Sequence, residues 1–221
     1  MSDIIEEVDE AYAQDQAMRW WKRLSPIVYG LVAVLILGVA VNEFLQWRGS
    51  NAHKQEAEAF YTARTALESN DYALAEALFE EIAGSDSDYA ELAGNYLAQT
   101  RLSGLGDKAA ALEALKATAE GEGPLAEIAR LKAGYLMADS SSLEELEAWL
   151  APLSNSLSSP YAYLAQEVEA ARAFSLGELE TAEKRFNAIA LALEVPQALR
   201  GRAERALIAI DAIQARNGTT Q

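Results

Sequence analysis

The side chains that most often carry enzyme chemistry are scarce in this sequence of 221 residues. It contains a single His, His53, and no Cys, which removes most metal sites, thiol chemistry and His-based acid–base catalysis. The acidic pairs Glu80/Glu81 and Glu144/Glu145 are consecutive, so their side chains point in different directions on a helix and cannot form one carboxylate dyad. No combination of nucleophile, base and orienting group, and no phosphate-binding loop, can be assembled. We therefore expect no enzyme activity, no catalytic or metal-binding residues and no cofactor.

The charge of the chain limits its partners further. The formal net charge is −16 at pH 7. So acidic a chain is repelled by phosphate backbones, and we therefore expect no nucleic-acid partner. The part of the chain after residue 47, about 170 residues, is long enough to enclose a hydrophobic core as one domain.

This region predicts helices throughout, because it is rich in Ala, Leu and Glu and its apolar residues recur every three or four positions. Turn-forming residues divide it into eight helices and a last one. One pattern recurs: a turn at Gly or Asn followed by Asp or Glu, a small residue in the next helix, and a large apolar residue four positions later. A fainter copy has Leu in place of the small residue. The equivalent positions, in steps of 36, 35 and 36, are Ala75, Ala111, Leu146 and Ala182.

This repeat is similar to the tetratricopeptide repeat, whose period is about 34 residues. A small residue is needed where two paired helices cross closely, and the large residue fills the space one turn on. The first helix of each unit also has a position where a small residue is expected. The resemblance is imperfect because one of these four residues is not small. These positions are Ala63, Gln99, Gly134 and Ala170.

The resemblance implies an all-α fold in which degenerate tetratricopeptide-like repeats stack as an α-solenoid. Stacking is expected because no single helix pair can bury its apolar face alone. We place the repeat domain at residues 48–216, with a C-terminal capping helix over 198–215 and a flexible tail at 217–221.

In tetratricopeptide proteins the first helices line a concave surface. Aligning each unit on its small residue places four aromatic rings and one cation on this surface. The predicted protein-binding groove consists of Phe60, Arg64, Tyr96, Tyr135 and Phe174. Aromatic rings with a polar tip are common at protein-binding surfaces. The alternative is that each ring packs between the helices of its own unit.

The most apolar stretch of the chain, residues 25–47, precedes the repeats. Residues 24–42 carry no charged side chain, and a helix over 26–47 would be about 33 Å long, close to the thickness of a bilayer core. The polar segment before it is acidic, and no small-residue cleavage site follows, so a cleaved signal peptide is the weaker interpretation. We expect a transmembrane anchor at 25–47 that follows an acidic cytoplasmic tail at 1–24.

The orientation of this anchor rests on a small excess of positive charge. Arg19, Lys22 and Arg23 precede the apolar stretch, and Arg48 and Lys54 follow it. The positive-inside rule therefore favours a cytoplasmic N-terminus.

Together, the acidic tail, the single anchor and the degenerate repeats resemble the bacterial ancillary subunit of the Sec translocon. The most specific patches are residues 89–99, 176–182 and 194–199. The resemblance implies a single-pass protein of the bacterial inner membrane with its N-terminus in the cytoplasm and its repeat domain in the periplasm. The implied partners are Sec translocon subunits and a membrane-anchored periplasmic chaperone of the prolyl-isomerase type, with translocating polypeptides as candidate clients.

Two functions fit this architecture. The first is a scaffold that binds proteins at the translocon and assists their transfer to periplasmic chaperones. The second is a structural coordinator that tethers other envelope or division machinery. A surface that binds unfolded, apolar peptides favours the first, whereas a rigid partner with one defined interface favours the second.

Overall fold

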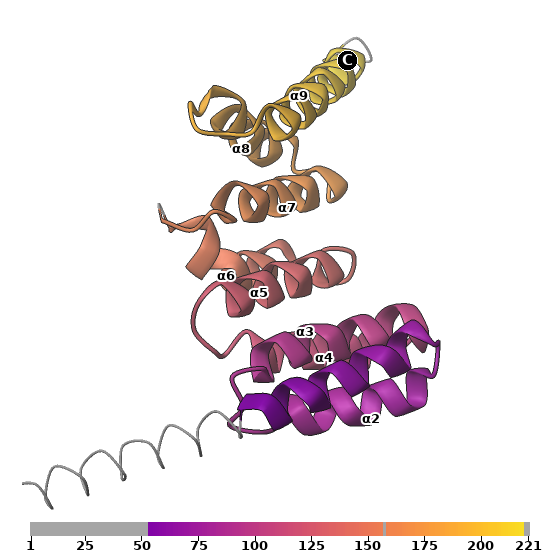
Figure 1. Ribbon diagram of the computed structural model, residues 1–221. Helices are drawn as coiled ribbons and strands as arrows, with labels where there is room; N and C mark the ends of the chain where they lie inside the picture. The colour runs from indigo at the N-terminus through magenta and orange to yellow at the C-terminus, as the bar shows by residue number, and fades with distance from the viewer. Residues whose placement is uncertain (1–52, 157, 219–221) are drawn as a thin grey trace, which may run out of the picture. The chain divides into compact units, whose positions relative to one another are not determined.

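The computed structural model describes residues 53–156 and 158–218, and the chain from Glu56 onward forms one compact unit. Every regular element in these residues is helical, and they contain no strand, so the all-α prediction is confirmed (Figure 1). A π-helical turn, η1 (Thr100–Gly104), continues α3. The helices are 53–68, α2 (Tyr72–Ala83), α3 (Ala90–Gln99), α4 (Lys108–Thr118), α5 (Pro124–Met137), α6 (Leu143–Ser154), α7 (Ala162–Ser175), α8 (Leu179–Leu191) and α9 (Gln197–Gly218).

The predicted acidic tail at 1–24 and the predicted anchor at 25–47 lie outside the described residues. No helix that the structure does describe is both long and apolar enough to cross a membrane. The anchor therefore stays a prediction from the sequence.

The residue types at the turns of the repeat are explained by the backbone conformation there. Asn70, Gly106 and Gly177 all adopt positive φ angles, between 62° and 78°, in the left-handed region that Gly and Asn tolerate best. The acidic residue that follows begins the next helix. Asp71 and Asp107 each accept a hydrogen bond from a backbone N–H three positions on, at 3.3 Å and 2.9 Å. Each of these turns thus ends one helix and starts the next.

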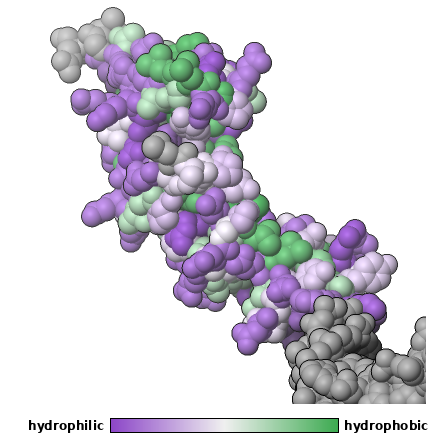
Figure 2. Space-filling model, turned by 60° about the vertical axis from the view of Figure 1, so that its left-hand side comes forward, coloured by the Kyte–Doolittle hydropathy of each residue, from purple (hydrophilic) through white to green (hydrophobic). Residues whose placement is uncertain are grey.

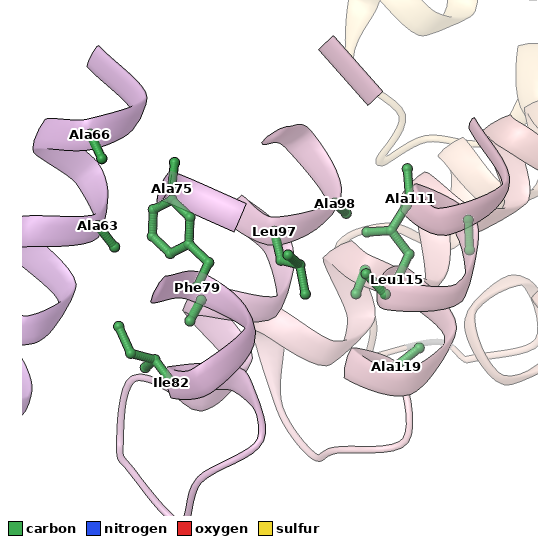
Figure 3. Packing of buried hydrophobic residues seen from close by; sticks show 14 residues of the cluster. Ala63, Ala66, Ala75, Phe79, Ile82, Leu97, Ala98, Ala111, Leu115 and Ala119 are labelled. Carbon is green, nitrogen blue, oxygen red and sulfur yellow. The ribbon is translucent and has the colours of Figure 1, made fainter. Parts of the chain in front are cut away.

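The spacing of small and large residues also has the predicted role. The four equivalent positions are fully buried at Ala75, Ala111, Leu146 and Ala182. The large residues four positions later are buried as well, at Phe79, Leu115, Leu150 and Phe186. Figure 3 shows Ala63 of helix 53–68 directed towards Ala75 and Phe79 of α2.

Consecutive helices pack against each other along the chain, as a stack of helix pairs requires. In addition, α3 contacts α5, α5 contacts α7, and α7 contacts α9. The first helices of successive units therefore form a row of their own, which we call the first-helix face. The C-terminal helix α9 packs on α8 and buries Leu199, Ala203 and Ile210.

The second unit departs from the prediction by one residue. Gln99 is exposed, and the buried small residue is its neighbour Ala98. The spacing from Ala98 to Ala111 is 13 residues, whereas it is 12 in the other units. The π-helical turn η1 directly after Gln99 accommodates this extra residue, because a π turn contains one residue more than an α turn.

Arginine side chains of α5 and α9 tie these two helices to the end of the preceding helix pair. Arg130 of α5 donates to the carbonyl of Ala119, at the end of α4, at 2.8 Å. Its guanidinium also lies 4.7 Å from the ring centre of Trp149. Arg200 of α9 donates to the carbonyl of Ala192, at the end of α8, at 2.7 Å. Such bonds satisfy carbonyl groups that a helix C-terminus leaves without a partner.

An ion-pair cluster around Arg185 joins the third and fourth units. Arg185 of α8 donates to the Glu169 carboxylate of α7 at 2.6 Å and also to the Glu147 carboxylate of α6. Glu169 is only 2% exposed. Burial raises the pKa of Glu169, and the Ser154 hydroxyl and Arg185 act in the opposite direction. One cation on α8 thus binds carboxylates on two other helices, α6 and α7.

Candidate protein-binding surface

The first-helix face contains a pocket between α3 and α5. Its volume is about 340 Å³, and its lining combines apolar side chains with a few polar ones. The lining residues are Asn95, Ala98, Gln99, Leu102, Ser103, Leu115, Lys132, Tyr135 and Leu136. A pocket with mostly apolar walls and few polar groups is typical of sites that take up a side chain or a small ligand.

The apolar walls of this pocket face solvent. Leu102 is 38% exposed and Tyr135 is 47% exposed, whereas Leu115 of α4 is buried beneath them. When a partner covers apolar side chains that were in water, the free energy falls by about 25 cal/mol per Å² of apolar surface covered. The pocket is therefore suited to an apolar side chain from another molecule.

The polar side of the pocket is partly fixed by hydrogen bonds. Lys132 donates from Nζ to Oδ1 of Asn95 at 3.0 Å. The Asn95 amide in turn donates to the carbonyls of Glu91 and Leu125, both at 3.1 Å. Lys132 is thus held at the pocket with two further N–H groups to donate. The side-chain amide of Gln99 is exposed and makes no hydrogen bond to the described residues.

The first-helix face continues beyond the pocket with a charged pair. Arg202 of α9 binds Glu167 of α7 through two hydrogen bonds of 2.6 Å and 2.7 Å. Burial and the Glu167 charge raise the pKa of Tyr135, and Arg202 acts in the opposite direction. Tyr135, Glu167 and Arg202 come from α5, α7 and α9, three helices that pack one on the next in the first-helix face. Tyr135 stays a neutral hydroxyl at pH 7, able to donate or accept a hydrogen bond.

Two of the predicted groove residues meet in a cluster of rings. Phe60 and Tyr96 lie 5.4 Å apart, edge to face. Tyr96 also stacks on the buried Phe79 at 5.3 Å, and Phe60 stacks on Tyr89 at 5.4 Å. Both Phe60 and Tyr96 are half-buried. These contacts are of the kind expected if the rings pack between helices. The binding role of Phe60 and Tyr96 stays a prediction.

The other three predicted residues are placed differently. Arg64 is exposed and donates from Nε to Glu68, one turn away on the same helix, at 2.7 Å. Tyr135 lines the pocket described above. Phe174 is half-buried and packs against the cluster that contains Phe186 and Leu199. Of the five residues, Tyr135 is the one that lines the pocket, and about half of its surface is exposed.

Of the residues that line this pocket, the predicted groove contained only Tyr135; the members that it missed include Asn95, Gln99, Leu102 and Lys132. For Asn95 and Gln99, the cause is the one-residue shift in α3. Aligning the second unit on Gln99 directed attention to Tyr96, whereas aligning it on Ala98 selects Asn95 and Gln99 at the positions that correspond to Phe60 and Arg64. A small residue directly beside a polar one at the repeat position was the available signal.

Comparison with protein families gives one finding. Residues 18–198 match the family model described as a tetratricopeptide repeat-like domain. The matched range includes residues 25–47 and every described helix up to the start of α9. Comparisons with curated proteins and with solved structures return no match.

Proposed function

The chain belongs to the tetratricopeptide repeat-like domain family, and from this membership we propose that it is a protein–protein interaction scaffold whose first-helix face binds an extended segment of a partner. Helix-pair repeats of this kind create long surfaces that take up partner chains. The pocket between α3 and α5 is the observation that carries the proposal, because it exposes Leu102 and Tyr135 beside polar groups that are held in place.

The chemistry of the pocket defines the segment that fits. An apolar side chain of the partner enters between Leu102 and Tyr135. The free amide of Gln99 pairs with the backbone of the segment, which needs one donor and one acceptor per residue. Lys132 and the Tyr135 hydroxyl pair with carbonyl or carboxylate oxygens. The preferred ligand is thus an extended, apolar stretch with exposed backbone groups, as an unfolded polypeptide presents.

We further propose that this scaffold works at the bacterial inner membrane, with residues 25–47 as its anchor and the repeat domain in the periplasm. The support comes from the apolar run, from the charges that flank it and from the resemblance to the ancillary subunit of the Sec translocon. On this proposal the partners are translocon subunits and a membrane-anchored periplasmic chaperone of the prolyl-isomerase type. The function is to assist the transfer of secreted or membrane proteins between them.

The experiment compares two pocket variants with a matched surface variant. Leu102→Asp and Tyr135→Ala alter the pocket, whereas Leu176→Asp changes a leucine that is also exposed but lies at the end of α7, outside the pocket. Full-length protein in detergent is tested for binding to an unfolded apolar polypeptide and for co-purification with translocon subunits. We expect the pocket variants to lose at least about tenfold in affinity, or 1.4 kcal/mol, and Leu176→Asp to bind normally.

Two results would redirect this proposal. Normal binding by both pocket variants would place the interface elsewhere. Binding of a folded partner at one defined interface, with no binding of unfolded chains, would favour the alternative function, a structural coordinator of envelope or division machinery.

A further inference from the structure

A second pocket lies between the N-terminal ends of α7 and α9, and we call it the α7–α9 pocket. Its volume is about 780 Å³, within the range of about 300–1,000 Å³ that is usual for ligand sites. The connection between α6 and α7 and the connection between α8 and α9 supply part of its lining. It is separate from the pocket between α3 and α5, because the two share no lining residue.

The α7–α9 pocket continues the first-helix face. One of its lining residues is Arg202, which binds Glu167 of α7. The helix that carries Tyr135, α5, packs on α7, and α7 packs on α9. Measured across the helices, two steps of about 8–10 Å separate the two pockets, and about six residues of an extended chain span this distance.

The α7–α9 pocket contains a carboxylate that the domain leaves available. Glu194 is exposed and forms no ion pair or side-chain hydrogen bond within the described residues. The two nearby cations have other partners. Arg202 holds Glu167 through two hydrogen bonds, and Arg200 donates to the carbonyl of Ala192 at 2.7 Å. Glu194 is therefore able to pair with a cation from another molecule.

The rest of the lining suits the stem of a long basic side chain. Leu164, Pro196 and Ala198 supply apolar walls, and the hydroxyl of Tyr163 makes no hydrogen bond to any residue that the structure describes. In the space-filling view, hydrophobic side chains gather among hydrophilic ones at the end of the repeat domain that carries α8 and α9 (Figure 2). Lys and Arg use both kinds of surface, because their methylene stems pack on apolar groups while their charged ends pair with polar ones.

Building on the function proposed above, we propose that the α7–α9 pocket binds a lysine or arginine side chain of the same partner segment. The charged end pairs with Glu194, and the Tyr163 hydroxyl accepts a further N–H. An acidic side chain of the partner would instead meet Glu194 as a like charge. The formal net charge of −16 favours basic segments in the same sense. The segment is therefore apolar at one point and basic at another, at least about six residues away.

Designed peptides test this preference on full-length protein in detergent. The probe is a fluorescent peptide with a central leucine and, on both sides, lysines that alternate with serines, so that it allows for either direction of the segment and for a range of spacings. A matched peptide has serine at every lysine position. Fluorescence anisotropy gives the affinities at about 0.15 M salt, where exposed charges are largely screened beyond about 8 Å.

Two variants of equal net charge separate the pocket from the overall charge of the chain. Glu194→Lys places a cation in the α7–α9 pocket. Glu204→Lys is the control, because Glu204 is an exposed residue of α9 outside the pocket. We expect Glu194→Lys to weaken binding of the lysine peptide by at least about tenfold, and Glu204→Lys by no more than about threefold. Equal losses in the two variants would overturn the proposal, since net charge alone would then attract the peptide.

Leu102→Asp, in the pocket between α3 and α5, distinguishes this proposal from the proposed function. Weaker binding of both peptides by Leu102→Asp, with no loss for Glu194→Lys, would overturn the role of the α7–α9 pocket and leave the proposed function standing. A loss for Glu194→Lys with none for Leu102→Asp would support the α7–α9 pocket and contradict the role of the pocket between α3 and α5.

Discussion

Gly134 of α5 lies so close to Leu150 of α6 that a β-carbon added at Gly134 would come within 2.6 Å of the leucine Cδ2. Leu150 is fully buried, and its Cδ1 and Cγ would also lie only 3.2 Å from the added carbon. Gly134 therefore permits the close crossing of the two helices. Its role in the third unit corresponds to that of the small alanines in the other units.

Replacing Gly134 with Ala tests this close crossing. Alanine favours the helix by about 1 kcal/mol, but overpacking against Leu150 costs about 1–3 kcal/mol, so we expect a net loss of stability. Gly201→Ala is the matched control, because the nearest atom to an added β-carbon there is the mobile Nη1 of Arg205, at 3.5 Å. We expect Gly201→Ala to raise the unfolding midpoint measured by circular dichroism, and Gly134→Ala to lower it. A rise for both variants would show that α5 and α6 have room to separate.

The buried alanine of the fourth unit gives a second prediction. Ala182 is fully buried in α8, whereas Ala188 on the same helix is exposed. Replacing Ala182 with Phe should separate the paired helices and lower the free energy of unfolding by about 1–3 kcal/mol. Ala188→Phe should change it by less than about 0.5 kcal/mol, as surface substitutions usually do. Urea denaturation of both variants provides the comparison, and similar losses would count against the repeat alignment.

The ion pair of Arg185 gives a prediction that depends on pH. Arg185→Met leaves the carboxylate of Glu169 buried without its cation. Removing one partner of a fully buried pair costs about 3–5 kcal/mol, and we expect somewhat less here because the Arg185 side chain is 29% exposed. Arg64→Met is the control, since Arg64 and Glu68 form an exposed pair that contributes under about 1 kcal/mol.

The direction of the pH effect follows from the raised pKa of Glu169. A carboxyl whose pKa is higher in the folded than in the unfolded chain lowers stability above the folded pKa. This cost disappears as the pH falls through the folded pKa towards the ordinary value of 4.5. Loss of Arg185 raises the pKa of Glu169 further. The stability difference between Arg185→Met and the natural chain should therefore shrink between pH 7 and pH 5, and a constant difference would exclude Glu169 as its source.

Two tyrosines on the first helices should respond differently to the same substitution. Tyr96 stacks on Phe79 and is half-buried, so Tyr96→Ala should lower the free energy of unfolding by about 2–4 kcal/mol. Tyr135 is 47% exposed and stacks on no other ring among the described residues, so Tyr135→Ala should change the free energy of unfolding by under about 1 kcal/mol and affect binding instead. Thermal unfolding separates the two cases. Equal destabilisation would mean that Tyr135 also serves packing rather than binding.

Local sequence patterns predicted much of this fold. The helices and the turns at Asn70, Gly106 and Gly177 follow from residue spacing and from the left-handed conformations that Asn and Gly accept. The buried positions Ala75 and Ala182 follow from the repeat itself. Each of these features depends on residues only a few positions apart, so the sequence contains most of the necessary information.

The register of α3 could not be predicted in this way. The π-helical turn η1 adds one residue after Gln99. Gly104 at its end indicates that a helix stops there, but it does not indicate that the last turn contains an extra residue. The direction of a ring is also set by tertiary contacts. Tyr96 and Tyr135 occupy similar helices, yet one stacks on Phe79 and the other lines the pocket. Predicting the pocket therefore required the packing of α3, α4 and α5.

The most direct test of binding on the first-helix face is site-specific photo-cross-linking in intact membranes. A photoreactive phenylalanine replaces Gln99 or Tyr135 in the pocket, and Leu176 or Tyr61 at exposed sites outside it. We predict that the pocket positions cross-link to a translocon subunit, to the periplasmic chaperone or to a translocating chain, and that the control positions do so several-fold less. Equal labelling from all four positions, or labelling from the control positions alone, would contradict the account.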